Sequence, residues 1–193
     1  MESFRRGIFR RPRNAWLAVA VYTSLLYATL TLVYDGYIWA FERIGPDWMS
    51  RGLNSAYFVA GLALLAFASL RGRRGLQAWA ALAMIAGSAA FCLWLEEVPA
   101  NRLHLMQYAP LAIFGLDALR TRLAGGRLYA AVLVLVFAIG CGDELLQSLL
   151  PNRRFDPRDV ALNLTAGALA LLFVAVVLGP ENYPWGRSPN RQD

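Results

Sequence analysis

The amino-acid sequence predicts an all-α fold, a polytopic membrane helix bundle of about six transmembrane helices with a short interfacial amphipathic helix. Of the 193 residues, 58% are hydrophobic, and they gather in long runs. A helix needs ~20 mostly apolar residues to cross the hydrocarbon core of a bilayer. Charged residues form short clusters between the runs, and no stretch has the mixed composition of a soluble domain. We therefore expect one transmembrane domain over residues 1–193.

The predicted spans follow the apolar runs in chain order. Four runs lack charged residues, namely residues 15–34, 53–70, 76–95 and 160–178. The two others, residues 103–119 and 128–150, contain polar and charged side chains, and the fifth helix has two candidate ends, Gly142 and Leu150. Ionisable groups in membrane helices are costly and usually face the bundle interior or a wet cavity. These two spans are therefore where we expect functional residues.

Between the first two runs, large apolar residues recur at roughly helical spacing: Tyr37, Ile38, Phe41, Ile44 and Trp48. Charged residues occupy the positions between them. This pattern predicts an amphipathic helix that lies in the membrane interface.

The basic residues predict the orientation of the bundle. All 19 are Arg, and with six spans 13 of them fall on the side of both termini and 6 on the other side. The positive-inside rule then places the basic segment 1–14 and a mobile tail, 180–193, in the cytoplasm. Arg153, Arg154 and Arg158 run against this rule, so we expect them to pair with carboxylates or to contact a ligand. This distribution indicates membrane orientation, and we expect no nucleic-acid partner.

Under this topology the polar residues of the last three spans meet at the extracytoplasmic face. The candidate polar or ligand-binding cluster comprises Arg102, His104, Gln107, Tyr108, Asp143, Glu144, Gln147, Arg153, Arg154, Asp156, Asp159 and Asn163. Negative charge is unfavourable at a helix C-terminus. Asp143 and Glu144 therefore predict a nearby cation, with Arg102, Arg153 or Arg154 as candidates.

Some of these residues also have a purely structural interpretation. Asp156 followed by Pro157 is a favourable start for a helix, with Asp as the N-cap. Arg153 and Arg154 could be solvated interface residues, and His104 could be a hydrogen-bonded residue at a helix start. 

Three residues outside the cluster have simple expected roles. Asp117 has Arg120 one helical turn away as a partner. Gly167 permits close approach of a neighbouring helix.

The motifs that carry the cluster resemble those of the VanZ-like membrane proteins over residues 97–178. They are Asn101-Arg102-Leu103-His104 with Tyr108, Asp143-Glu144-x-x-Gln147, Pro151-x-Arg153-Arg154-Phe155-Asp156, and Asp159-x-x-x-Asn163-x-x-x-Gly167. Asn101 stands where that family often has an acidic residue, and Asn152 where a Gly is common. The resemblance implies a bacterial inner-membrane protein and a link to glycopeptide (teicoplanin) resistance, but it supplies no reaction.

Three functions remain open from the sequence. The first is binding of a polar or anionic envelope component, such as a lipid-linked or cell-wall ligand, with Arg153 and Arg154 contacting carboxylate or phosphate. The second is an accessory subunit of a membrane protein complex. The third is a hydrolase or transferase acting on a lipid-linked substrate, with Glu144 or His104 as general acid or base. The sequence contains no HExxH-like spacing, so we expect no metal and no cofactor.

Overall fold

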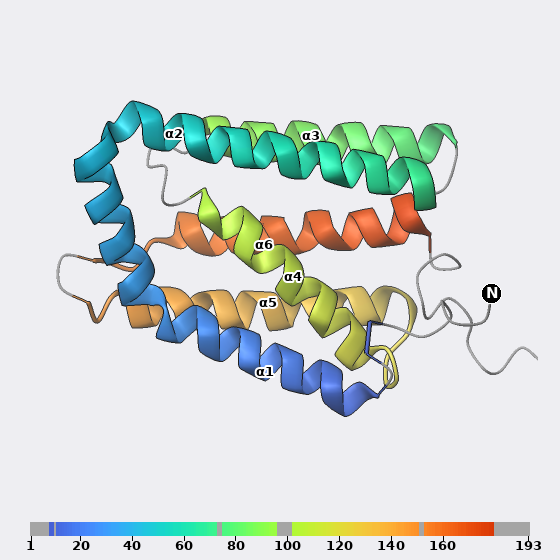
Figure 1. The fold of residues 1–193 in the computed structure, drawn as a ribbon. Helices are drawn as coiled ribbons and strands as arrows, with labels where there is room; N and C mark the ends of the chain where they lie inside the picture. Colours follow the sequence, from blue (N-terminus) through green and yellow to red (C-terminus); the bar gives the residue numbers. More distant parts are fainter. Residues whose placement is uncertain (1–7, 10, 73–74, 96–101, 151–152, 180–193) are drawn as a thin grey trace, which may run out of the picture.

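The computed structural model describes residues 8–9, 11–72, 75–95, 102–150 and 153–179. The predicted tail, 180–193, most of the basic N-terminus and Asn101 lie outside these residues. The described part is all-α (Figure 1), and its elements are α1 (Pro12–Ala28), α2 (Leu30–Arg71), α3 (Leu76–Leu95), α4 (Leu103–Leu119), α5 (Gly125–Gln147), α6 (Pro157–Leu172) and a π-helical end, η1 (Phe173–Leu178).

The first two helices differ from the prediction in their boundaries. α1 ends at Ala28, and α2 then runs from Leu30 to Arg71, through the expected interfacial helix into the second span. A sharp kink at Gly45 divides α2, with a φ of 79° directly before Pro46. Proline removes an N–H donor and disfavours the helical conformation of the residue before it, and glycine adopts positive φ without a steric penalty. The first part of α2 consequently crosses the end of the bundle, and the second part runs along it (Figure 1).

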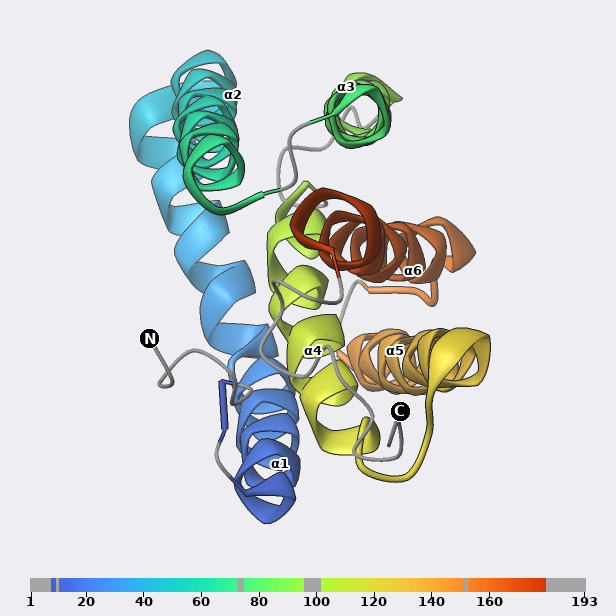
Figure 2. The same ribbon diagram turned by 90° about the vertical axis from the view of Figure 1, so that its right-hand side faces the viewer.

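The core of the bundle is built around α4. This helix packs against α1, α5 and α6, and Figure 2 shows it between α1 on one side and the α5–α6 pair on the other. Tyr108, Leu111 and Leu116 on α4 are fully buried. Gly167 on α6 faces Val136 of α5, and a Cβ at Gly167 would meet the valine side chain at 3.1 Å. The close approach predicted for Gly167 is therefore present.

The fold is that of a polytopic helical membrane protein, although fewer helices than predicted are long enough to span a bilayer. Four described helices meet the length and composition of a span: Leu30–Leu70, Leu76–Leu95, Gly125–Gln147 and Pro157–Leu178. α1 and α4 have 17 residues each, which corresponds to ~25 Å of helix, less than the ~30 Å hydrocarbon core. Large apolar side chains such as Leu17, Phe58 and Trp94 are exposed on the outer surface. Such a surface contacts the lipid of a bilayer.

Candidate functional site

The helix directions bring most of the predicted polar residues to one end of the bundle. α5 ends at Gln147, whereas α4 begins at Leu103 and α6 begins at Pro157, and these three termini lie at the same end in Figure 1. The structure thus answers the open question about the fifth helix, which continues past Gly142. Asp143, Glu144 and Gln147 occupy its last two turns, and all three are buried.

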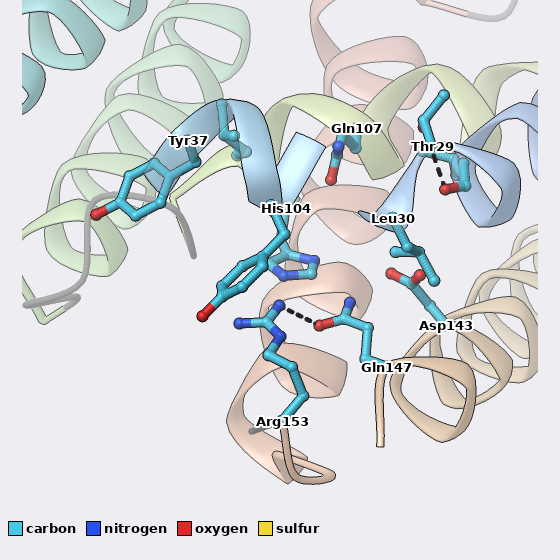
Figure 3. Close-up of a pocket in the computed structure, with 11 residues that line it drawn as sticks. Thr29, Leu30, Tyr37, His104, Gln107, Asp143, Gln147 and Arg153 are labelled. Atoms are coloured by element: carbon cyan, nitrogen blue, oxygen red, sulfur yellow. Dashed lines mark hydrogen bonds between the residues drawn. The ribbon is translucent and has the colours of Figure 1, made fainter. Parts of the chain in front are cut away.

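A small pocket opens at this end between α1, α2, α4 and α5. Its polar lining comes from His104, Gln107, Asp143, Gln147 and Arg153, which Figure 3 shows pointing toward a common space. Its remaining lining residues are Leu26, Thr29, Leu30, Tyr34, Tyr37 and Leu103. The cavity has a volume of about 50 Å³. One buried water needs ~10–15 Å³ on this scale, so the pocket holds a few waters, an ion or one small charged group.

Each of the two carboxylates beside the pocket accepts a hydrogen bond through one of its two oxygens. The Tyr108 hydroxyl donates to Oδ2 of Asp143 at 2.9 Å, and the backbone N–H of Asp156 donates to Oε2 of Glu144 at 3.1 Å. Asp143 and Glu144 are 2% and 1% exposed. Their other oxygens, Oδ1 and Oε1, are buried and have no hydrogen-bond partner among the described residues.

His104 lies between these carboxylates and α6. Its Nε2 is 3.7 Å from Oδ2 of Asp159, while its Nδ1 is buried without a hydrogen-bond partner in the described part of the chain. Asn163 is fully buried one turn after Asp159 and packs against Gly140 of α5, where a Cβ would meet its side chain at 3.1 Å. The α5–α6 contact beside the histidine therefore depends on a glycine.

Three of these side chains form a group with the composition of a metal site. One ring nitrogen of His104 and one carboxylate oxygen each of Asp143 and Glu144 lie within 4.8 Å of one another. All three residues are buried. No metal was expected from the sequence because no linear spacing indicates one, whereas this group combines residues of two helices.

Arg153 supplies positive charge at the mouth of the pocket. Its guanidinium donates a hydrogen bond to Oε1 of Gln147 and lies 4.8 Å from the centre of the Tyr34 ring, in the range of a cation–π contact. Of the three arginines proposed to neutralise Asp143 and Glu144, Arg153 is the one that lines the pocket. Its hydrogen bond goes to the glutamine amide on the same helix as these carboxylates.

Three other predicted site residues have different surroundings. Arg102 donates from Nη1 to Ser50 and to Asn54 on α2, at 3.0 Å each. Arg154 is exposed and does not line the pocket. Asp156 caps α6, since its Oδ1 accepts from the backbone N–H of Arg158 at 2.8 Å. The capping interpretation of Asp156 is thus confirmed, and its backbone also reaches Glu144.

Asp117 lies at the opposite end of α4 and is fully buried. It forms the predicted ion pair with Arg120, and its Oδ2 also accepts from the backbone N–H of Phe9 at 2.8 Å. Arg120 in turn donates to the Phe9 carbonyl oxygen at 3.2 Å. The role of Phe9 could not be predicted from its side chain, because its contribution comes from backbone groups.

The sequence analysis missed the contribution of the first two helices to the pocket. Leu26, Thr29, Leu30, Tyr34 and Tyr37 line it; the first four belong to the first apolar run, and Tyr37 belongs to the predicted interfacial helix. The two tyrosines near the end of the first run were the available signal. Their position depends on where α1 ends and α2 turns, which the apolar pattern did not show.

This fold and site define a class of protein: a polytopic helical membrane protein with a polar cluster buried at one end of its bundle. The VanZ/LLP1 family model matches residues 8–179, and the chain belongs to this family. The match includes α1 to α3 as well as the region 97–178 that carries the resemblance. Comparison with curated proteins and with solved structures gave no significant match.

Proposed function

We propose that this protein binds the charged headgroup of an anionic or polar envelope lipid, or of a lipid-linked precursor, in the pocket between α1, α2, α4 and α5. The position of Arg153 is the observation that supports this proposal most directly. Its guanidinium lines the pocket, with Gln147 and the Tyr34 ring fixing its orientation. A guanidinium binds phosphate or carboxylate through paired N–H donors.

The composition of the pocket suits an amphiphilic ligand. Leu26, Leu30 and Leu103 provide apolar lining beside the polar groups of Gln107 and Arg153. At about 50 Å³, the cavity has room for one charged group of a ligand and not for a whole lipid. The chains of such a ligand would therefore lie outside the pocket, along the apolar outer surface of the helices.

The orientation belongs to the proposal as well. With both termini in the cytoplasm of a bacterium, the pocket faces the extracytoplasmic side of the inner membrane, where lipid-linked cell-wall precursors are exposed. This placement rests on the positive-inside rule, because with six spans 13 Arg fall on the side of both termini and 6 on the other side.

Headgroup binding is tested by thermal stabilisation of the purified full-length chain in detergent. Phosphatidylglycerol or a polyprenyl phosphate is added, with phosphatidylcholine as the neutral comparison. A ligand that binds only the folded state raises the unfolding temperature with its concentration. We expect the anionic lipids to stabilise the wild type and the Arg153→Gln variant to lose this response.

Arg154→Gln is the matched control, because Arg154 is the neighbouring residue with the same charge but lies outside the pocket. It should respond to the anionic lipids as the wild type does. Equal responses of both variants and the wild type would show that the lipids act on surface charge alone, and the pocket proposal would fail.

A second candidate function is catalysis on a lipid-linked substrate. The observation that favours it is the His104–Asp159 pair, in which a buried carboxylate lies 3.7 Å from the imidazole, as in sites where a carboxylate orients a histidine base. Asp159→Asn should then abolish turnover of an isotope-labelled polyprenyl phosphate or phospholipid and leave its binding intact. Unchanged turnover in this variant would exclude Asp159 as the group that orients His104.

A further inference from the structure

The buried group of His104, Asp143 and Glu144 combines one imidazole and two carboxylates from α4 and α5. His104 Nδ1, Asp143 Oδ1 and Glu144 Oε1 are all buried and lack a hydrogen-bond partner among the described residues. Buried polar groups are normally hydrogen-bonded, and leaving them unpaired is costly. A cation shared by the three residues would satisfy such atoms, since one ligand atom of each lies within 4.8 Å of the others.

The side-chain hydrogen bonds described for the arginines near the pocket go to other groups. The guanidinium of Arg153 bonds to the Gln147 side chain, and Arg102 bonds to Ser50 and Asn54 on α2. The ligand atoms of the three residues nevertheless lie within 4.8 Å of one another. The space between them is suited to a small ion, not to a long side chain.

We infer that His104, Asp143 and Glu144 together bind one divalent cation, with the imidazole and two carboxylates as its ligands. Mixed nitrogen and oxygen donors fit Zn²⁺ or Mn²⁺. Atoms that share one ion at ~2.0–2.2 Å are at most ~4.4 Å apart, so the separations of up to 4.8 Å must shorten for the side chains to close around it.

The residues behind these ligands have the arrangement that supports metal sites. Metal-binding carboxylates and imidazoles are usually held by further hydrogen bonds or carboxylates that fix their orientation. Here the Tyr108 hydroxyl holds one oxygen of Asp143, and the Asp156 N–H holds one oxygen of Glu144. Asp159 lies beside Nε2 of His104. Each ligand residue thus has one atom next to a supporting group and another atom without a hydrogen-bond partner among the described residues.

The cation would also change what the pocket can bind. His104 and Asp143 line the cavity, so an ion between them has its open coordination positions toward the space beside Arg153. An anionic group would then meet a cation and a guanidinium in place of two uncompensated carboxylates. This consequence rests on the proposed headgroup binding, whereas the cation site itself does not.

Cation binding is tested on the full-length chain in detergent after removal of any affinity tag and treatment with EDTA. Mn²⁺ is titrated and followed by electron paramagnetic resonance, with Zn²⁺ as competitor. We expect one Mn²⁺ per chain, displaced by Zn²⁺, with a coupling to a coordinated nitrogen in the spectrum of the bound ion. His104 is the only histidine in the chain, so an imidazole coupling identifies the site.

Glu144→Gln and His104→Gln should each weaken Mn²⁺ binding by more than tenfold, and Asp159→Asn by about 10- to 100-fold. Arg154→Gln should bind as the wild type does. If the ligand variants do not fold by circular dichroism, the nitrogen coupling in the wild type decides the question. A wild type without a bound Mn²⁺ or Zn²⁺ ion, or a bound Mn²⁺ without the nitrogen coupling, overturns the inference.

Arg153→Gln separates this inference from the proposed function. We expect this variant to keep Mn²⁺ and to lose stabilisation by phosphatidylglycerol. One bound Mn²⁺ per chain, in a wild type whose unfolding temperature does not change with anionic lipids, would support the cation site and refute headgroup binding. A lipid response that is unchanged by EDTA and by Glu144→Gln, in a wild type without bound ion, would refute the cation site alone.

Discussion

The Tyr108 hydroxyl donates a hydrogen bond of 2.9 Å to Oδ2 of Asp143, which ties the first turns of α4 to the last turns of α5. Tyr108 is fully buried and Asp143 is 2% exposed. Both side chains are therefore almost inaccessible to bulk solvent. Because the other oxygen of Asp143 has no hydrogen-bond partner in the described structure, this hydroxyl is the principal support of the carboxylate.

We expect Tyr108→Phe to destabilise the protein by about 1 to 2 kcal/mol, the upper range for a polar contact between membrane helices. The ring still fills its site, but Oδ2 of Asp143 loses its donor, so that neither carboxylate oxygen then has a hydrogen-bond partner among the described residues. Thermal unfolding in detergent measures the change. Tyr129→Phe, on the first part of α5, is the control and should have a smaller effect. Equal stability of Tyr108→Phe and the wild type would show that the bond contributes nothing.

Gly167→Ala should destabilise the protein by about 1 to 3 kcal/mol, the usual cost of overpacking a core. The new methyl group would meet the Val136 side chain at 3.1 Å, and a β-branched residue has little freedom to rotate away. Gly87→Ala is the matched control, because a Cβ at Gly87 meets nothing within 4 Å.

Chemical denaturation of both glycine variants provides the comparison. The control should be neutral or stabilising, since alanine favours helix over glycine by about 1 kcal/mol. A stable Gly167→Ala would show that α5 and α6 separate easily at this point, contrary to the packing described above.

Asp117→Ala should loosen the N-terminal end of the bundle. It leaves the Arg120 guanidinium, 15% exposed, without its carboxylate and removes the acceptor of the Phe9 N–H. Breaking a buried ion pair from one side costs about 3 to 5 kcal/mol. Thermal unfolding measures the loss, and limited proteolysis should show faster cleavage near residues 8–11.

A double variant checks the origin of this effect. Asp117→Asn combined with Arg120→Gln removes both charges and should recover part of the stability lost in Asp117→Ala. Asp47→Asn, at an exposed position of α2, should leave stability unchanged. If the double variant is less stable than Asp117→Ala, the ion pair is not the source of the loss.

The sequence predicted the membrane class, the helix directions and the end of the bundle where polar residues gather, because these follow from apolar runs and from the alternation of antiparallel helices. It also predicted the Asp117–Arg120 pair and the close approach at Gly167, which depend on helical spacing within or between adjacent elements. These features are local or follow from connectivity.

The pocket could not be predicted in full because it depends on tertiary geometry. Tyr34 and Tyr37 reach it only because α1 ends at Ala28 and α2 crosses the end of the bundle before its kink at Gly45. The group of His104, Asp143 and Glu144 likewise combines two helices whose contact no linear motif encodes. Arg102 and Arg154 carry the positive charge predicted near Asp143 and Glu144, but Arg102 contacts α2 and Arg154 is exposed.

The orientation of the bundle is the last prediction, and it decides which ligands can reach the pocket. In a chain lacking Cys92 and Cys141, we expect a cysteine at Arg154 to be labelled on intact cells by a membrane-impermeant thiol reagent. A cysteine at Ala124, at the opposite end of the bundle and exposed, should be labelled only after the cells are opened. Arg154 is beside the pocket without lining it, so its replacement leaves the site intact. The reverse labelling pattern would place the pocket in the cytoplasm, and lipid headgroups of the inner leaflet would then be its ligands instead of cell-wall precursors.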